Sequence, residues 1–293
     1  MNIIDDIQSG KVLLSDGAWG TMLMDRGLKT NECPESWNLT NEKVIAEIAA
    51  EYVAAGADII TTNSFGATKF KLVHYSLEDR LEEINIKAAS IAKKAISGNR
   101  YIFGSIGPTG KILMMGEVSE DELFEDFKIR AASLEKGGAD LILIETMTAI
   151  DEAVLAVKAA KEFTNLPVAC TFTFDKLLTG DYKTIMGVSA KDMLDALIGA
   201  GADIIGSNCG NGIDGMVDIV SEIRSLNRDI PVLIQANAGM PCIVNGKNVF
   251  PETPEQMTSK LKDLIENGAN IVGGCCGTTP EHISSFRKLL GSI

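Results

Sequence analysis

The sequence predicts a (β/α)8 barrel of the TIM type, formed by one domain over residues 1–293. The length suits such a barrel, which typically needs about 250 residues. A Gly-Ala phrase recurs four times along the chain, and eight short apolar runs alternate with eight helical patterns. Alternating units of this kind predict a parallel sheet with helical connections, and the count of eight favours a closed barrel over an open sheet.

The recurring phrase marks the point where a helix stops and a strand begins. It reads Gly-Ala-Asp-Ile-Ile at 56–60 and 201–205, Gly-Ala-Asp-Leu-Ile at 138–142, and Gly-Ala-Asn-Ile-Val at 268–272. Glycine just past a helix end is the usual left-handed stop. Its return at similar spacing indicates repeated supersecondary units.

The remaining elements fall between these phrases. Four more strands are expected at 12–16, 101–104, 168–174 and 232–236. Helical patterns lie at 44–55, 81–95, 122–136, 151–163, 190–198, 216–226, 254–266 and 280–290. A capping box, Ser119-x-x-Glu122, is predicted before the third of these helices.

Composition restricts the partners and the cellular location. The net charge is −13, which disfavours nucleic acid and anionic membrane as partners because phosphate binding needs clustered cations. No apolar run approaches the roughly 18 residues of a membrane span, and the first residues do not read as a signal peptide. We therefore expect a cytoplasmic protein.

Polar side chains stand where the predicted strands end. In a (β/α)8 barrel the carboxyl ends of the strands carry the functional residues. Packing alone does not explain why apolar strands repeatedly end in acids, amides and thiols. The residues at these ends are Asp16, Asn63, Glu145, Cys209, Asn237, Cys275 and Cys276.

Three of these residues, Cys209, Cys275 and Cys276, form a candidate metal site. Adjacent cysteines would point to opposite faces of a regular strand, but the glycines around Cys275 and Cys276 permit an irregular backbone that turns both sulfurs to one side. The chain has only two histidines, so a transition-metal site must be built on sulfur, which favours zinc. The alternative is three small buried cysteines packed beside glycines.

A zinc ion held by three thiolates keeps a fourth position open. Such a site is suited to binding an incoming thiol and removing its proton, and the resulting thiolate is the nucleophile. Alkyl transfer to a thiol therefore fits better than hydrolysis. A redox protein with a Cys275–Cys276 disulfide is a further alternative, disfavoured because a bridge between neighbours is strained.

Several longer motifs carry a family resemblance. They are residues 16–21, 62–68, 106–110, 145–146, 208–209 and Gly-Gly-Cys-Cys-Gly-Thr-Thr-Pro at 273–280. On these motifs the sequence resembles the homocysteine S-methyltransferase family along its whole length. Gln-Ala-Asn-Ala-Gly at 235–239 makes it most similar to the homocysteine-binding module of cobalamin-dependent methionine synthase.

The resemblance implies roles for individual residues. The three cysteines match the zinc ligands of the family. Asp16 and Glu145 match acids near the substrate ammonium group, which needs an anionic partner once it leaves water; the alternative is that they bind nearby backbone. Asn237 matches a residue that fills the fourth zinc position before substrate arrives.

The resemblance also implies homocysteine as the methyl acceptor and methionine as the product. No corrinoid-binding or folate module is recognisable in the 293 residues, so methylcobalamin is expected on a partner corrinoid protein. The betaine branch has a tyrosine after the aromatic residue of the second-strand loop, where this chain has Gly66 after Phe65. This difference disfavours betaine. Betaine, S-methylmethionine or S-adenosylmethionine as donor, another small thiol as acceptor, and a non-catalytic binding subunit of a corrinoid complex are the alternatives.

One motif resembles a dinucleotide-binding loop, but its context does not fit that function. Residues 210–215 match G-x-G-x-x-G after a strand, but the following strand ends in Gln235-Ala236-Asn237 rather than in the acid that a dinucleotide site requires. We expect instead that the helix start at Gly212 offers N–H groups to the substrate carboxylate.

Overall fold

The computed structural model describes residues 3–96, 98–244 and 247–292. Eight parallel strands form one sheet in the order β1-β12-β9-β8-β5-β4-β3-β2. A parallel bridge between Ser15 and Ile59 joins the two outer strands and closes the barrel. The strands are β1 (Leu13–Leu14), β2 (Ile59–Thr61), β3 (Tyr101–Ile106), β4 (Leu141–Met147), β5 (Val168–Phe172), β8 (Ile204–Asn208), β9 (Val232–Ala236) and β12 (Ile271–Gly274). The predicted fold class is confirmed.

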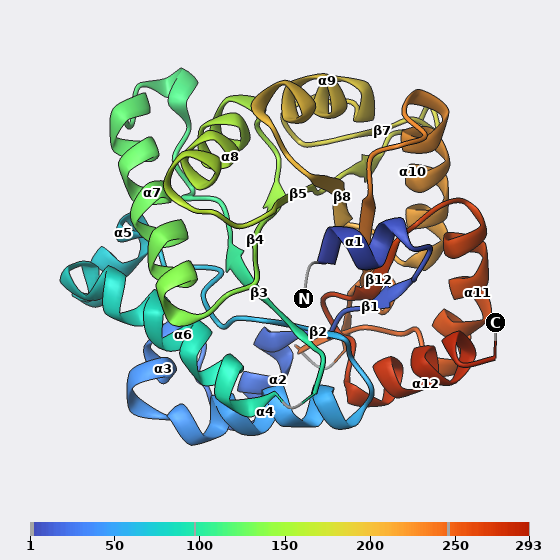
Figure 1. Cartoon of the computed structure of the whole chain (residues 1–293), viewed down its shortest axis with the longest axis horizontal. Helices are drawn as coiled ribbons and strands as arrows, with labels where there is room; N and C mark the ends of the chain where they lie inside the picture. The colour runs from blue at the N-terminus through green and yellow to red at the C-terminus, as the bar shows by residue number, and fades with distance from the viewer. Residues whose placement is uncertain (1–2, 97, 245–246, 293) are drawn as a thin grey trace.

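Eight long helices surround the strands as a ring (Figure 1). The predicted capping box is present, since Ser119 accepts a hydrogen bond from Glu122 N and the Glu122 carboxylate accepts one from Ser119 N. Gly138 and Gly201 end their helices in the left-handed conformation, as the repeated phrase predicts. The helices are α4 (Glu42–Ala54), α6 (Leu81–Ala95), α7 (Glu120–Gly137), α8 (Ile150–Phe163), α9 (Ala190–Ala200), α10 (Ile213–Leu226), α11 (Pro254–Glu266) and α12 (Pro280–Leu290).

The core has two layers because each strand is buried on both faces. The larger layer lies between the sheet and the helix ring. The smaller layer fills the barrel near the amino ends of the strands, where Ile3 and Ile7 pack against residues such as Phe103 and Leu233. These two isoleucines belong to α1 (Ile3–Gln8), a short helix that the sequence did not predict and that lies across the middle of the ring in Figure 1. This end of the barrel is thus plugged, which leaves the opposite end for a site.

The connections that follow the strands are long and carry short elements of their own. They include α2 (Trp19–Asp25), α3 (Trp37–Thr40), α5 (Lys69–Leu72) and the hairpins β6–β7 (Asp175–Lys176, Tyr182–Lys183) and β10–β11 (Cys242–Val244, Lys247–Val249). These connections also expose large apolar side chains, namely Met114, Met115, Leu178, Ile185, Met240 and Ile243. Across the described ranges, the helices all fall short of the length and apolar character that a membrane crossing demands.

Candidate metal centre and substrate pocket

The three predicted cysteines converge at the carboxyl ends of two strands. Cys209 follows β8, Cys275 and Cys276 follow β12, and only β9 lies between these strands. Their sulfur atoms all lie within 4.8 Å of one another, and Cys209 Sγ lies 3.7 Å from Cys276 Sγ. Two thiolates about 2.3 Å from one tetrahedral zinc would be about 3.8 Å apart, so the spacing fits this ion. The three cysteines form a possible metal-binding cluster.

The local backbone explains how the sulfurs meet. Cys209 has a positive φ of 59°, which turns the chain sharply where β8 ends. On the other strand, a Cβ on Gly274 would lie 2.2 Å from Thr278 Oγ1, so only glycine lets this threonine fold back. Thr278 Oγ1 donates to Cys275 O at 2.7 Å and fixes the turn. The predicted role of the glycines beside the paired cysteines agrees with this geometry.

The cluster already favours one thiolate. Hydrogen bonds from Cys275 and Cys276 hold the pKa of Cys209 well below its usual range, and the same contacts raise the pKa values of the two donors. Three sulfurs at this spacing cannot all be ionised without a cation between them. The donor set therefore suits a metal ion that binds thiolates.

A cavity of about 410 Å³ opens beside the cysteines at the carboxyl end of the barrel. Trp19 and Phe65 supply aromatic surface, while Ser105 and Glu145 supply polar groups. The size suits a small organic molecule. This location is the one predicted from the polar residues at the strand ends.

Glu145 lies in a bulge of β4, and its side chain lines this cavity. Ile144 pairs with Cys170 and Met147 pairs with Phe172, so Glu145 and Thr146 together face one residue of β5. Burial raises the pKa of Glu145 to about 7, and a hydrogen bond from Ser105 Oγ opposes this shift. The neighbouring charge of Asp16 raises the pKa further.

Asn208 holds the bulge, and sequence reasoning did not assign it a role. Its Nδ2 donates to Thr146 Oγ1 at 2.8 Å and lies 3.4 Å from Glu145 Oε2. Its Oδ1 accepts from Thr146 N at 2.8 Å and from Thr171 Oγ1 at 2.7 Å. The signal available in the sequence was an amide at the end of an apolar strand, directly before a candidate ligand.

Comparisons with known proteins decide the family. A sequence profile described as homocysteine S-methyltransferase matches residues 13–290. The chain belongs to the homocysteine S-methyltransferase family. The resemblance drawn from the motifs is thereby confirmed at the level of the family.

Two similar proteins are methionine synthases from mycobacteria. The protein from Mycobacterium tuberculosis is 31% identical over 308 aligned residues, which cover 98% of this chain and 25% of the relative. The protein from Mycobacterium leprae is 31% identical, with 93% of this chain and 24% of the relative covered. The chain therefore spans about a quarter of the length of these methionine synthases.

Solved structures support the barrel. The metallated form of the homocysteine methyltransferase MmuM from Escherichia coli has a TM-score of 0.79 at 24% identity, covering 95% of this chain and 96% of that one. The oxidised form has a TM-score of 0.79 at 23% identity, covering 99% and 100%. These similarities show the fold that this member of the homocysteine S-methyltransferase family adopts.

Asp16 is placed behind the cavity wall. It is fully buried, and its carboxylate accepts hydrogen bonds from Thr61 N at 2.8 Å, Thr61 Oγ1 at 2.9 Å and Trp19 Nε1 at 3.0 Å. Burial raises its pKa to about 6 although these bonds oppose the shift. One of these donors, Thr61 N, is a backbone group, as in the alternative interpretation, and the other two are side chains. A role toward substrate stays a prediction.

Asn237 lies next to the cysteines and is buried. A hydrogen bond from its side chain contributes to the lowered pKa of Cys209. Its Oδ1 is buried and accepts no hydrogen bond from the described part of the chain. A buried carbonyl oxygen without a partner is unfavourable, so this amide has unused capacity toward a ligand.

The predicted carboxylate site at the start of α10 is wrong. A Cβ on Gly212 would lie 2.8 Å from Glu252 Oε1, and Glu252 receives a hydrogen bond from the Ile213 backbone. An internal carboxylate already binds this helix start, which does not line the cavity beside the cysteines.

Proposed function

We propose that this chain transfers a methyl group to the thiol of homocysteine and so forms methionine, using one zinc ion held by Cys209, Cys275 and Cys276. The observation that carries the proposal is the convergence of three sulfurs beside a cavity that also contains a half-buried acid, Glu145. When bound, zinc keeps its three cysteines ionised and, at its open position, lowers the pKa of an incoming thiol. Asn237 is the candidate for that position before substrate arrives.

The acids account for recognition of an amino acid. Half-buried Glu145 and fully buried Asp16 lie close enough for their charges to interact, and neither forms an ion pair with a cation in the described residues. Each pKa is raised mainly by burial. A substrate ammonium beside Glu145 would supply the missing positive charge and stabilise the ionised carboxylate. Asp16 would contribute negative charge toward the ammonium from behind Thr61, which lines the cavity.

The first turn of α2 is the candidate site for the substrate carboxylate. Residues Trp19, Gly20 and Thr21 line the cavity. First-turn N–H groups of a helix lack intrahelical acceptors, so they are available to an anion. This assignment replaces the one made for α10.

The methyl donor is proposed to be methylcobalamin carried by a partner corrinoid protein. The similarity to methionine synthases supports this donor. The exposed apolar side chains on the connections that follow β3, β5 and β9 support a docking partner, because these connections lie at the end of the barrel that α1 does not plug. Attack by the homocysteine sulfur then moves the methyl group in line, and positioning supplies much of the rate.

A small cationic donor is the second candidate. Trp19 and Phe65 line the same cavity as Glu35, which is buried. Aromatic faces with a nearby carboxylate suit a sulfonium or quaternary ammonium group, as in S-methylmethionine, S-adenosylmethionine or betaine.

A donor screen with zinc-loaded protein and homocysteine tests the proposal. Methylcobalamin, S-methylmethionine, S-adenosylmethionine and betaine are offered separately, and methionine is quantified. Methionine formation with at least one donor supports the proposal and rejects a non-catalytic binding subunit. The proposal is contradicted if other small thiols are methylated and homocysteine is not. It is also contradicted if none of the four donors gives methionine.

A further inference from the structure

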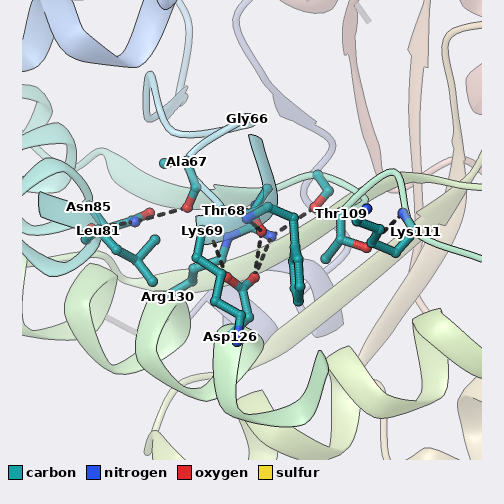
Figure 2. Close-up of polar contacts among 12 residues, drawn as sticks. Gly66, Ala67, Thr68, Lys69, Leu81, Asn85, Thr109, Lys111, Asp126 and Arg130 are labelled. Carbon is teal, nitrogen blue, oxygen red and sulfur yellow. Dashed lines mark hydrogen bonds and ion pairs between the residues drawn. The ribbon is translucent and has the colours of Figure 1, made fainter. Parts of the chain in front are cut away.

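A buried pair of charges lies on α7, beneath the connections that follow β2 and β3. Arg130 and Asp126 are one helical turn apart and fully buried, and Arg130 Nη1 lies 3.5 Å from Asp126 Oδ2 (Figure 2). Removing charges from water is costly unless they gain hydrogen bonds. The partners of this pair therefore indicate its role.

Arg130 joins the two connections through their main chains. Its Nη1 donates to Gly107 O at 3.0 Å, and its Nη2 donates to Phe65 O at 3.0 Å. Gly107 N also donates to Phe65 O at 3.0 Å. The planar guanidinium reaches both carbonyl oxygens at once, which a lysine ammonium on its single stem is poorly shaped to do.

Asp126 binds residues 68 and 69 of the connection that follows β2. Its carboxylate accepts from Thr68 Oγ1 at 2.8 Å and from Lys69 N at 2.8 Å (Figure 2). The two charged residues therefore hold both ends of residues 65–69 against α7. Neither touches the cysteines.

Within residues 65–69, the side chain that lines the cavity is Phe65. It is 37% exposed and lines the cavity that contains the cysteines. A Cβ on Gly107 would lie 2.4 Å from Phe65 Cε2, so the ring lies directly against the glycine that Arg130 binds. In the barrel, β2 is four strands away from β8, which places Phe65 across the mouth from Cys209.

We propose that Arg130 is a positioning residue that holds Phe65 as the wall against which the methyl donor lies. This inference rests on the proposed function, because a donor must reach the acceptor sulfur through the mouth, between the cysteines and the opposite wall. Without Arg130 the two connections lose their shared anchor, and the aromatic wall is displaced. Metal and homocysteine contact other residues and remain bound.

The test compares Arg130→Met with Arg224→Met. Arg224 is a matched control because it also donates to main-chain carbonyls, those of Ile230 and Gly268, but next to the amino ends of β9 and β12. Three quantities are measured for each variant: the amount of bound zinc, the homocysteine Kd by calorimetry, and kcat/KM for the methyl donor. The donor is free methylcobalamin or the one that the screen selects. Arg130→Met should lose tenfold or more in donor kcat/KM, with zinc and homocysteine binding within twofold of wild type. Arg224→Met should keep all three values.

Two further variants separate positioning from a general loss of stability. Phe65→Ala should lower donor kcat/KM, and adding Arg130→Met should cost little more, because both changes remove the same wall. Arg130→Lys should be intermediate, since it keeps the charge but not the paired donors. The inference would be overturned if the losses in donor kcat/KM were additive in the double variant. It would also be overturned if Arg130→Met weakened donor kcat/KM, homocysteine binding and zinc binding equally.

Hydrogen exchange gives a readout that needs no turnover. Arg130→Met should accelerate exchange of the amides at 65–69 and 107–111, while Arg224→Met leaves them unchanged. Unchanged exchange in Arg130→Met overturns the inference even if the enzyme is active. Absence of turnover in wild type overturns the proposed function instead, so the two failures are distinguishable.

Discussion

Asn208 Oδ1 accepts a hydrogen bond from Thr146 N at 2.8 Å, and this contact links β8 to the bulge in β4. Thr146 has a positive φ of 63°, which is unfavourable for a β-branched residue and must be held by its surroundings. The amide of Asn208 also binds Thr146 Oγ1, so it satisfies both the backbone and the side chain of the strained residue. The direction in which Glu145 points thus depends on a side chain from another strand.

Replacing Asn208 should therefore weaken homocysteine binding. Asn208→Ala removes three contacts at the bulge and one with Thr171 of β5, and it is expected to cost about 1–3 kcal/mol in the free energy of unfolding, because buried groups lose their partners. The homocysteine Kd should rise tenfold or more. Thr171→Val removes only one donor and serves as the control, with a smaller change in both quantities. Wild-type affinity in Asn208→Ala would contradict the role of the bulge.

Glu145→Gln should separate stability from substrate binding. Burial raises the pKa of Glu145 from 4.5 to about 7, so the folded protein keeps this proton to a higher pH than the unfolded chain. The contribution of this group to stability is therefore full below about pH 4.5 and is lost as the pH rises to about 7. Glutamine stays uncharged and avoids this loss.

Urea unfolding of the zinc-free protein at pH 5 and pH 8 checks this prediction. Glu145→Gln should be about 1–3 kcal/mol more stable than wild type at pH 8 and close to it at pH 5. The same variant should bind homocysteine more weakly at pH 8. A variant that is less stable at pH 8 would show that the carboxylate is stabilised by its neighbours rather than strained by burial.

Gly206 should be irreplaceable for the position of Cys209. A Cβ at Gly206 would lie 1.8 Å from Leu233 O, a main-chain atom of β9 that cannot move without breaking the barrel. Gly206→Ala is expected to destabilise the fold by more than about 3 kcal/mol and to lose zinc. Gly199→Ala is the control: it lies in α9 with open space around it and should gain about 0.5–1 kcal/mol. Equal thermal stability of the two variants would refute this account of the strand packing.

Much of the barrel could be predicted from the sequence because its signals are local. The bounds of α6, α11 and α12 agree with the predicted ranges, and for α11 and α12 a threonine followed by proline marks the start of the helix in the chain itself. The metal cluster was predictable because the residues end strands whose order follows from the fold. The short helix α1 was missed, since six residues give too little periodicity to detect.

The parts that could not be predicted depend on contacts between distant residues. Nothing near Gly212 in the chain indicates that Glu252 binds the start of α10. The bulge at Glu145 and its support by Asn208 join positions 63 residues apart. Arg130 lies within the helical pattern predicted at 122–136, and only the packed structure shows that it is fully buried against two connections.

The central claim is that Cys209, Cys275 and Cys276 bind one zinc ion and leave a position for the homocysteine sulfur. X-ray absorption at the zinc edge, on protein loaded with one zinc per chain, counts the sulfur neighbours directly. We predict three sulfur ligands without homocysteine and four with it, and no stoichiometric zinc in Cys275→Ser. A sulfur count that does not change when homocysteine binds, or full zinc binding by Cys275→Ser, would contradict the account.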